Sequence, residues 1–278
     1  MAIKVSIQGY EGSFHQVAAR HLFGKDVEVL PCATFREVVK LALDKKATDF
    51  GLMAIENSLA GSILPNYHLL QQNKLKVVGE LYLHISQNLL VNPGVKLADI
   101  KEVHSHPMAL LQCLDFLGKH AFKLVETEDT ALSAKHLHQH RSKTTAAIAS
   151  KLAAELYGLK VLAPDIQTQK NNITRFLVLR REKEAVIPQN ADKASVYFQT
   201  NHTKGILAKV LGIIAEGGIN LSKLQSMPIP GSNFKYGFYA DMEFQEVAQF
   251  EAVMESLESA TNNLRVFGMY KKGKRIKG

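Results

Sequence analysis

Short apolar runs with strand character alternate with helical patterns from the beginning of the chain, and this alternation constrains the fold more than any other feature. The first cycle holds strand-like runs at residues 2–7, 27–30 and 50–55, and helical patterns at residues 13–22, 34–43 and near 63–70. A β-α-β-α-β order predicts a mostly parallel sheet with helices on both faces. We therefore expect an α/β fold.

A second cycle of the same kind follows. Its strand-like runs lie at residues 102–105, 122–126, 146–149 and 159–163, and its helical patterns at residues 107–117, 130–140 and 151–157. A long extended stretch, residues 75–91, joins the two cycles, and residues 174–179 are the strand left to carry the chain back. Two lobes joined by two crossing strands predict a hinge with a cleft for a small ligand.

The pattern changes after the polar segment 180–193. The remaining strands and helices follow a β-α-β-β-α-β order over about eighty residues, which is the ferredoxin-like arrangement. This part is expected to form a separate α+β domain.

Composition agrees with an ordinary globular protein. The chain has 278 residues, of which 46% are hydrophobic and 22% charged, enough for two domains. It has no apolar run of about 18 residues and no basic segment leading into an apolar one, so we predict no membrane span or secretory signal, no membrane partner and a cytoplasmic location. Cys32 and Cys113 stand among apolar neighbours and are expected to be buried free thiols.

The positive charge is concentrated at one end of the sequence. The formal net charge is +8, and residues 271–278 supply five basic and no acidic side chains. No stripe of aromatic and basic residues accompanies them. We therefore expect residues 273–278 to be a solvated, frayed basic tail, and we expect no nucleic-acid partner.

Three places join a strand to a helix through small polar residues. They are "GYEGSF", with Ser13 at a helix start; "ENSLAGSI", with Asn57, Ser58, Gly61 and Ser62; and "HSHPMALLQC", with Ser105 as the expected N-cap before Pro107. Each alone is explained by ordinary capping and turns. Because all three follow strands where ligands of open α/β folds bind, together they predict an anion site.

The sequence contains few motifs that would indicate a metal or cofactor site. His136 and His140 share a helix face, but the sequence offers no third ligand near them. The patterns GxGxxG, GxxxxGK[ST] and GxSxG do not occur. We expect neither a metal nor an organic cofactor.

The returning strand is entered through polar residues, in "NNITRFLVL". A buried strand normally excludes an unpaired ion, which costs several kcal/mol or more. Arg175 therefore either caps the strand in solvent or faces an anion in the cleft.

These residues carry a family resemblance. "GYEGSFHQVAA", "MAIENSLAGSI", "SHPMALLQC", "AAIASKLAAELYGLKVLAPDIQ" and "NNITRFLVL", in this order and followed by "GILAKVLGIIAEGGINLSKLQSMP", closely resemble the prephenate dehydratase family. The resemblance implies a two-lobed catalytic domain like a periplasmic binding protein at residues 1–182, with lobe one at about 1–80 plus 174–182 and lobe two at about 81–173. It further implies an ACT regulatory domain at residues 193–272.

The resemblance also implies an activity and its residues. Prephenate would lose water and carbon dioxide to give phenylpyruvate in phenylalanine biosynthesis, without a cofactor. The residues implied are Thr174, Arg175 and Phe176 as the catalytic triplet, and Ser13, Asn57, Ser58, Gly61, Ser62, Ser105 and His106 as substrate-binding. We expect Arg175 to hold a carboxylate and Thr174 to hydrogen-bond to the departing hydroxyl, both facing the cleft.

The ACT resemblance implies inhibition by phenylalanine and a homodimer or homotetramer. The effector residues it implies are Gly205, Ile206, Leu207, Asn220, Leu221, Gln225, Ser226, Met227 and Pro228. Gln225 and Met227 replace the family's glutamate and arginine, so other contacts must hold this segment. His15, where the family tends to have serine or threonine, is a departure within the cleft.

Two other functions stay open at this stage. Arogenate dehydratase differs only in an amino group in place of the substrate's side-chain ketone. A non-catalytic amino-acid sensor is the rival from another class, and the intact Thr174-Arg175-Phe176 triplet argues against it. The sequence has no leading helical domain of a chorismate mutase, so we expect that reaction to come from another protein.

Overall fold

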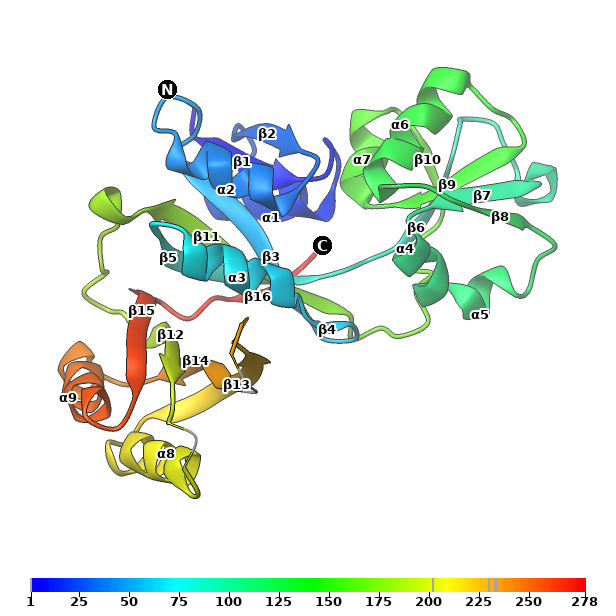
Figure 1. Cartoon of the computed structure of the whole chain (residues 1–278). Helices are drawn as coiled ribbons and strands as arrows, with labels where there is room; N and C mark the ends of the chain where they lie inside the picture. Colours follow the sequence, from blue (N-terminus) through cyan, green and yellow to red (C-terminus); the bar gives the residue numbers. More distant parts are fainter. Residues whose placement is uncertain (1, 202, 230, 233–234) are drawn as a thin grey trace. The chain divides into compact units, whose positions relative to one another are not determined.

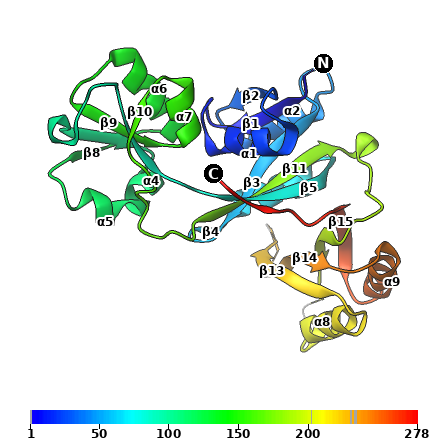
Figure 2. The same ribbon diagram turned by 180° about the vertical axis from the view of Figure 1, so that it is seen from behind.

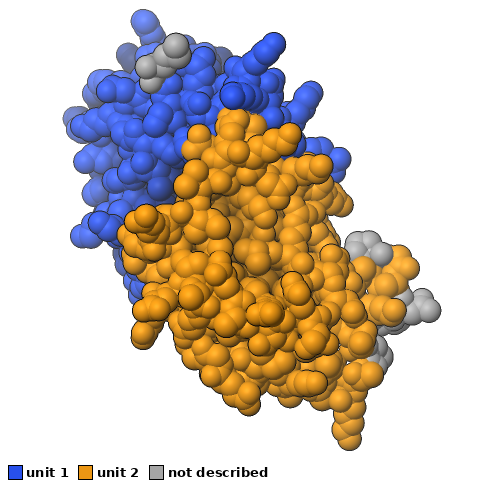
Figure 3. Space-filling model, turned by 90° about the vertical axis from the view of Figure 1, so that its left-hand side faces the viewer, with its two compact units in different colours: residues 1–66, 81–176, 274–278 blue, residues 67–80, 177–273 orange. Residues whose placement is uncertain are grey.

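The computed structural model describes residues 2–201, 203–229, 231–232 and 235–278, and these residues form three β-sheets flanked by helices (Figure 1). They cluster into two compact units (Figure 3). Unit 1 comprises Met1–Asn66, Leu81–Phe176 and Lys274–Gly278, and unit 2 comprises Tyr67–Glu80 and Leu177–Gly273. The mixed α/β fold predicted from the sequence is confirmed.

The first sheet has the strand order β16-β5-β11-β3-β1-β2, with β4 paired to β3. Its strands are β1 (Lys4–Gln8), β2 (Glu28–Cys32), β3 (Phe50–Asn57), β4 (Gly61–Ser62), β5 (Leu75–His84), β11 (Ile173–Arg181) and β16 (Arg275–Lys277). Helices α1 (Phe14–Phe23), α2 (Phe35–Leu43) and α3 (Leu64–Gln72) alternate with the first of these strands. As predicted, β1 is parallel to both β2 and β3.

The second sheet belongs to unit 1 and has the order β10-β6-β9-β7-β8. Its strands are β6 (Asn88–Val91), β7 (Glu102–Ser105), β8 (Lys123–Glu126), β9 (Thr145–Ala149) and β10 (Lys160–Ala163), and its helices are α4 (Pro107–Gln112), α5 (Leu114–Leu117), α6 (Thr130–His140) and α7 (Lys151–Leu156), with the 3-10 turn η1 (Leu97–Asp99). Helices cover both faces (Figure 2). Alternate residues of β9 supply the two cores: Ile148 packs with Leu110 of α4, whereas Ala147 packs with Leu137 of α6.

The stretch 75–91 carries the chain from the first sheet to the second: β5 ends at His84, and β6 begins at Asn88 in the other sheet. Two expectations about this region need correction. The second sheet is mixed rather than mostly parallel, since β6 runs antiparallel to both β9 and β10. The helix expected over residues 107–117 is likewise two helices, broken at the buried Cys113.

The third sheet, in unit 2, shows the predicted β-α-β-β-α-β order. Its elements are β12 (Lys193–Gln199), α8 (Ile206–Glu216), β13 (Asn220–Pro228), β14 (Tyr236–Glu243), α9 (Val247–Glu258) and β15 (Asn262–Tyr270), preceded by the 3-10 turn η2 (Glu182–Glu184). The strand order is β13-β14-β12-β15 with antiparallel pairing throughout. Val196 and Phe198 of β12 form an apolar core with Ile214 of α8 and Leu257 of α9.

The predicted effector residues lie in two elements of this unit. Gly205 is the N-cap of α8, with a φ of 81°, and Ile206 and Leu207 begin the helix. The other six lie on β13, which is an edge strand of its sheet. The division into catalytic and regulatory domains stays a prediction, and Pro230, two residues beyond the end of β13, lies outside the described residues.

The expectation of a frayed tail is wrong. Residues 275–277 form β16, which pairs in parallel with Tyr82, Leu83 and His84 at the end of β5. An edge strand presents unpaired backbone N–H and C=O groups, and a following segment gains hydrogen bonds by covering them. The basic side chains of this segment therefore project from an ordered strand.

The cysteine prediction is confirmed. Cys32 and Cys113 are both free and buried. Burial raises the pKa of the Cys32 thiol to about 11 and that of Cys113 to about 12, so neither is a nucleophile at neutral pH. No helix within the described ranges is long and apolar enough to span a membrane. The cytoplasmic location stays a prediction.

Candidate active site

Unit 1 contains a cavity of about 300 Å³ whose walls come from both of its sheets. Five of the predicted site residues line it, namely Ser13, Asn57, His106, Thr174 and Phe176. The sequence interpretation missed Gln8, Phe14, Ala54, Ile85, Gln112, Glu128, Asp129, Thr130 and Asn172 as lining residues. The lining includes Ile85, between β5 and β6, and Thr174 on β11, and the division into two lobes stays a prediction.

Thr174, on β11, is held by an amide side chain from β3. The Nδ2 atom of Asn57 donates a hydrogen bond to Thr174 Oγ1 at 3.0 Å and another to Asn172 Oδ1 at 2.7 Å. Because Thr174 Oγ1 accepts this bond, the hydroxyl proton of Thr174 remains for donation to another group. Asn57 thus orients a neutral donor at the cavity wall.

The amide network continues to α4, a helix that packs on the second sheet of unit 1. Asn172, which is fully buried, donates from Nδ2 to Oε1 of Gln112 at 3.0 Å. Gln112 is the last residue of α4 and also lines the cavity. A chain of side-chain amides therefore connects α4 with β3 and Thr174, and it holds the Thr174 hydroxyl in place through residues from both sheets.

Arg175 does not meet the expectation that it faces the cleft. Successive side chains of a strand point to opposite faces, so Thr174 and Phe176 share the cavity side and Arg175 lies on the other. Arg175 is 4% exposed, and its guanidinium carbon lies 5.8 Å from the ring centroid of Tyr82 on β5. Its assignment as a catalytic residue stays a prediction, but direct contact with a ligand in this cavity is not part of the observed geometry.

The three strand-to-helix junctions contribute unequally. Ser13 caps α1 by accepting a hydrogen bond from the backbone of Gln16. At α4 the N-cap is His106 rather than Ser105: His106 Nδ1 accepts from the Met108 backbone at 3.2 Å, whereas Ser105 is buried and donates to the Ile148 carbonyl at 2.7 Å. Both capped helices begin at the cavity, through Ser13 and His106.

The "ENSLAGSI" junction is not a direct entry to a helix. Gly61 and Ser62 form the short strand β4, which pairs back onto Asn57 and Glu56, and α3 begins only at Leu64. Ser58 and Ile173 are joined by two hydrogen bonds, Ser58 N to the Ile173 carbonyl and Ile173 N to Ser58 Oγ. Ser58, Gly61 and Ser62 are therefore absent from the described cavity lining, and Asn57 alone of this motif reaches it.

His15, on α1, is a buried neutral imidazole in the cavity wall. Its ring lies 4.9 Å from the ring of Phe176 in an edge-on arrangement and 5.5 Å from that of Phe35. Burial lowers the pKa of His15 from 6.5 to about 3. Its Nε2 atom is buried with no hydrogen-bond partner among the described residues.

This burial predicts a pH dependence of stability. The pKa of His15 in the folded protein lies below its value in the unfolded chain, so the unfolded chain binds a proton that the folded protein does not. Burial of the neutral imidazole therefore contributes to stability above about pH 6.5, and this contribution is lost as the pH falls toward about 3. When the pH falls from about 7 to about 4, the free energy of unfolding should fall by about 2–3 kcal/mol more in the wild type than in His15→Leu, which has no imidazole to protonate. Urea denaturation across this range measures the difference.

The exposed His21 on the same helix provides the matched control. The variant His21→Gln should retain the wild-type dependence on pH. Equal slopes for the wild type and His15→Leu would contradict the prediction.

Two acidic residues missed by the sequence interpretation stand at the start of α6. Asp129 is the N-cap, and its Oδ1 accepts from the Leu132 backbone at 2.9 Å. Glu128 Oε1 accepts a hydrogen bond from the Tyr10 hydroxyl at 2.5 Å. The available signal was an acidic pair directly before a helical pattern, which marks a fourth strand-to-helix junction.

The chain has a mixed α/β fold with a polar cavity in unit 1, and comparison with known proteins places it in a family. The prephenate dehydratase family model matches residues 5–184. Arogenate dehydratase 2 of Petunia hybrida is 37% identical over 96% of this chain and 71% of its own length. The chain belongs to the prephenate dehydratase family, and it is an enzyme of the dehydratase class of lyases.

Solved structures show the same fold. Prephenate dehydratase from Arthrobacter aurescens, in complex with L-Phe, superposes with a TM-score of 0.86 at 27% identity, covering 97% of this chain and 90% of the other. GqqA, described as a novel type of quorum quenching acylase, superposes with a TM-score of 0.88 at 29% identity and covers 97% and 98%.

Proposed function

We propose that this enzyme catalyses the decarboxylative dehydration of prephenate, or of its amino-acid form arogenate, to give phenylpyruvate or phenylalanine. In either case the ring carboxylate leaves as carbon dioxide, its bonding electrons complete the aromatic ring, and the 4-hydroxyl departs as water after gaining a proton. The observation that carries the proposal is the Thr174 hydroxyl, which lines the cavity and is oriented by Asn57. A neutral donor aimed at a departing oxygen lowers the barrier to its loss.

The remaining lining residues suit a substrate with several polar groups. Amide side chains of Gln8, Gln112 and Asn172 supply donors and acceptors, and His106 and Ser13 mark the helix starts that we propose for carboxylate binding. Phe14 and Phe176 supply apolar surface for the ring. Arg175 is proposed as a positioning residue, because its guanidinium packs on Tyr82 and supports the strand that carries Thr174.

A direct assay tests the reaction. Purified protein incubated with prephenate should form phenylpyruvate, and with arogenate it should form phenylalanine, each with release of carbon dioxide. Formation of neither product would overturn the proposed activity and favour a non-catalytic amino-acid sensor.

We further propose that residues 193–272 form an ACT regulatory domain and that residues 1–182 form the catalytic domain. The β-α-β-β-α-β unit supports this, as does the neighbour solved with L-Phe. Among the described residues β13, which carries Gln225 and Met227, pairs with β14 alone, and its other edge is the one proposed to pair with a second copy. Assembly through such edges yields a homodimer, or a homotetramer of two dimers.

Inhibition by phenylalanine follows from this assignment and is open to titration. Adding L-phenylalanine at up to millimolar concentration should lower the rate, with tyrosine and tryptophan less effective. Gly205→Ala should raise the concentration needed for half inhibition, since a φ of 81° disfavours any residue with a Cβ.

Gly212, in the middle of the same helix, is the matched control. A Cβ added there meets nothing within 4 Å among the described residues, so Gly212→Ala should leave the response unchanged. No response of the wild type to phenylalanine would contradict the proposed regulation.

A further inference from the structure

The cavity carries an unbalanced negative charge. Among its described lining residues the carboxylates are Glu128 and Asp129, and no lysine or arginine is present. His15 is neutral, because burial lowers its pKa to about 3, so it offers no positive charge. The buried Nε2 of His15, which has no hydrogen-bond partner within the part of the chain that the structure describes, adds a further polar group to this wall.

The two carboxylates are fixed in place by their neighbours. Asp129 is tied to the start of α6 through the Leu132 backbone, and its Oδ2 atom lies so close to Gly9 that a Cβ there would approach it to 2.9 Å. Glu128 is held by the Tyr10 hydroxyl. A carboxylate has about four acceptor positions, so both groups retain capacity for a ligand.

The chemistry of these groups distinguishes the two substrates. An ionised carboxylate only accepts hydrogen bonds, and so does the side-chain ketone of prephenate, which makes the two a mismatch. The ammonium group of arogenate donates three hydrogen bonds and carries the opposite charge. Prephenate also brings two uncompensated negative charges toward Glu128 and Asp129, whereas the ammonium group of arogenate cancels one of its two carboxylate charges.

We propose that Glu128 and Asp129 bind the substrate's ammonium group and make this enzyme select arogenate over prephenate. The inference rests on the proposed dehydratase function and adds the residues that choose its substrate. Asp129 is the stronger of the two anchors, because it is half-buried whereas Glu128 is exposed. Burial raises the pKa of the Asp129 carboxyl, and the adjacent Glu128 adds to this, so an ammonium placed beside them relieves a repulsion already present.

The test compares kcat/KM for the two substrates in matched variants. The wild type should favour arogenate by about tenfold or more, as expected for one charge-assisted hydrogen bond. Asp129→Asn keeps the helix cap, because asparagine is an equally good N-cap. It should lower kcat/KM for arogenate by about 10- to 100-fold and leave that for prephenate unchanged or higher.

Glu128→Gln should shift the ratio in the same direction by a smaller factor. Glu126→Gln is the control, since Glu126 is an exposed glutamate on the adjoining β8 that is not among the described cavity residues. It should leave the ratio at the wild-type value. Thermal denaturation midpoints of all variants show whether each is folded.

The outcomes separate this inference from the proposed function. Turnover of prephenate in preference to arogenate by the wild type, or an equal loss on both substrates in folded Asp129→Asn, overturns the role of the carboxylates while the dehydratase activity stands. Turnover of neither substrate by the wild type overturns the dehydratase proposal itself.

Discussion

Replacing Thr174 with alanine should lower kcat by about 10²–10⁴-fold, the usual contribution of a positioned proton donor, while KM changes little. Thr174 Oγ1 accepts a hydrogen bond from Asn57 Nδ2 at 3.0 Å, so the Thr174 hydroxyl keeps its proton for donation to a substrate in the cavity. Alanine removes the donor but leaves the surrounding amide network and the apolar wall in place. Steady-state kinetics on the preferred substrate measure the loss.

Thr174→Ser is the matched control. Serine retains the hydroxyl and its bond to Asn57, so most of the activity should remain. Near-normal turnover by Thr174→Ala, or an equal loss in both variants, would remove Thr174 from its proposed role. A rise in KM with kcat unchanged would assign it to substrate binding alone.

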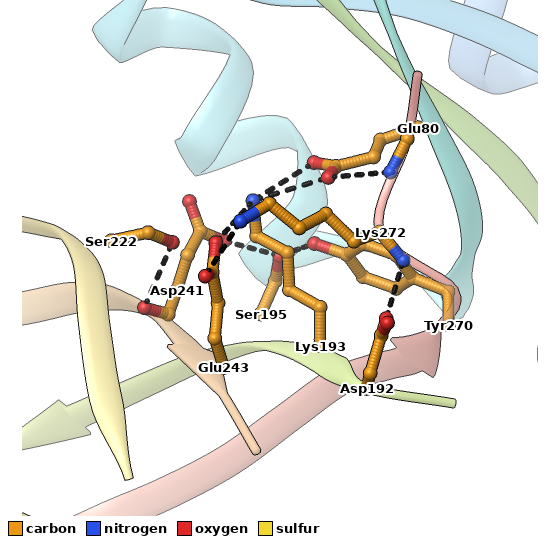
Figure 4. Close-up of polar contacts among 10 residues, drawn as sticks. Glu80, Asp192, Lys193, Ser195, Ser222, Asp241, Glu243, Tyr270 and Lys272 are labelled. Atoms are coloured by element: carbon orange, nitrogen blue, oxygen red, sulfur yellow. Dashed lines mark hydrogen bonds and ion pairs between the residues drawn. The ribbon is translucent and has the colours of Figure 1, made fainter. Parts of the chain in front are cut away.

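Lys193→Met should lower the free energy of unfolding by about 3–5 kcal/mol, because it leaves a buried carboxylate without its cation. Lys193 on β12 and Glu80 on β5 lie 3.1 Å apart between Nζ and Oε1, with side chains 1% and 0% exposed (Figure 4). The Gly273 backbone also donates to Glu80 at 3.0 Å. A neutral hydrogen bond of this kind does not replace a full opposite charge in such surroundings.

Two further variants make this test specific. Glu80→Gln combined with Lys193→Met removes both charges and should recover much of the lost stability. Lys271→Ala breaks the exposed pair with Asp192 in the same region, where the lysine side chain is 56% exposed, and should cost less than about 1 kcal/mol. Urea denaturation of the four proteins decides, and a Lys193→Met variant as stable as Lys271→Ala would show that the buried pair contributes little.

The polar side of the third sheet explains why this pair is buried. Lys193 and Ser195 alternate along β12 with Ala194 and Val196, which face the apolar core. Ser195 Oγ donates to Asp241 at 2.6 Å and meets the Tyr270 hydroxyl at 2.6 Å (Figure 4). Within unit 2 this side of the sheet is covered by residues 67–80, which supply Glu80 and accept hydrogen bonds from Arg265. Strand β12 is therefore buried on both faces, and the face opposite the apolar core holds the charged Lys193.

The sequence by itself determined the order of the elements and the motifs at their ends. Local patterns suffice for this, because period-two and period-3.6 apolar spacing marks strands and helices, and a small polar residue such as Ser13 marks a helix start. Strand periodicity also places Thr174 and Phe176 on one face and Arg175 on the other, which is at odds with the expectation from the resemblance that Thr174 and Arg175 both face the cleft.

Only the tertiary structure decided which face meets the cavity. The pairing of β11 between β3 and β5 turns Thr174 and Phe176 inward and Arg175 away, and this pairing joins segments far apart in sequence. The same holds for Glu128 and Asp129, which enter the site because α6 begins beside Gly9, the residue that follows β1. It holds as well for β16, whose partner lies on β5. Neighbouring residues determine the preference for helix or strand, whereas the charges and hydrogen-bond donors that line a cavity are brought together by contacts between residues far apart in the sequence.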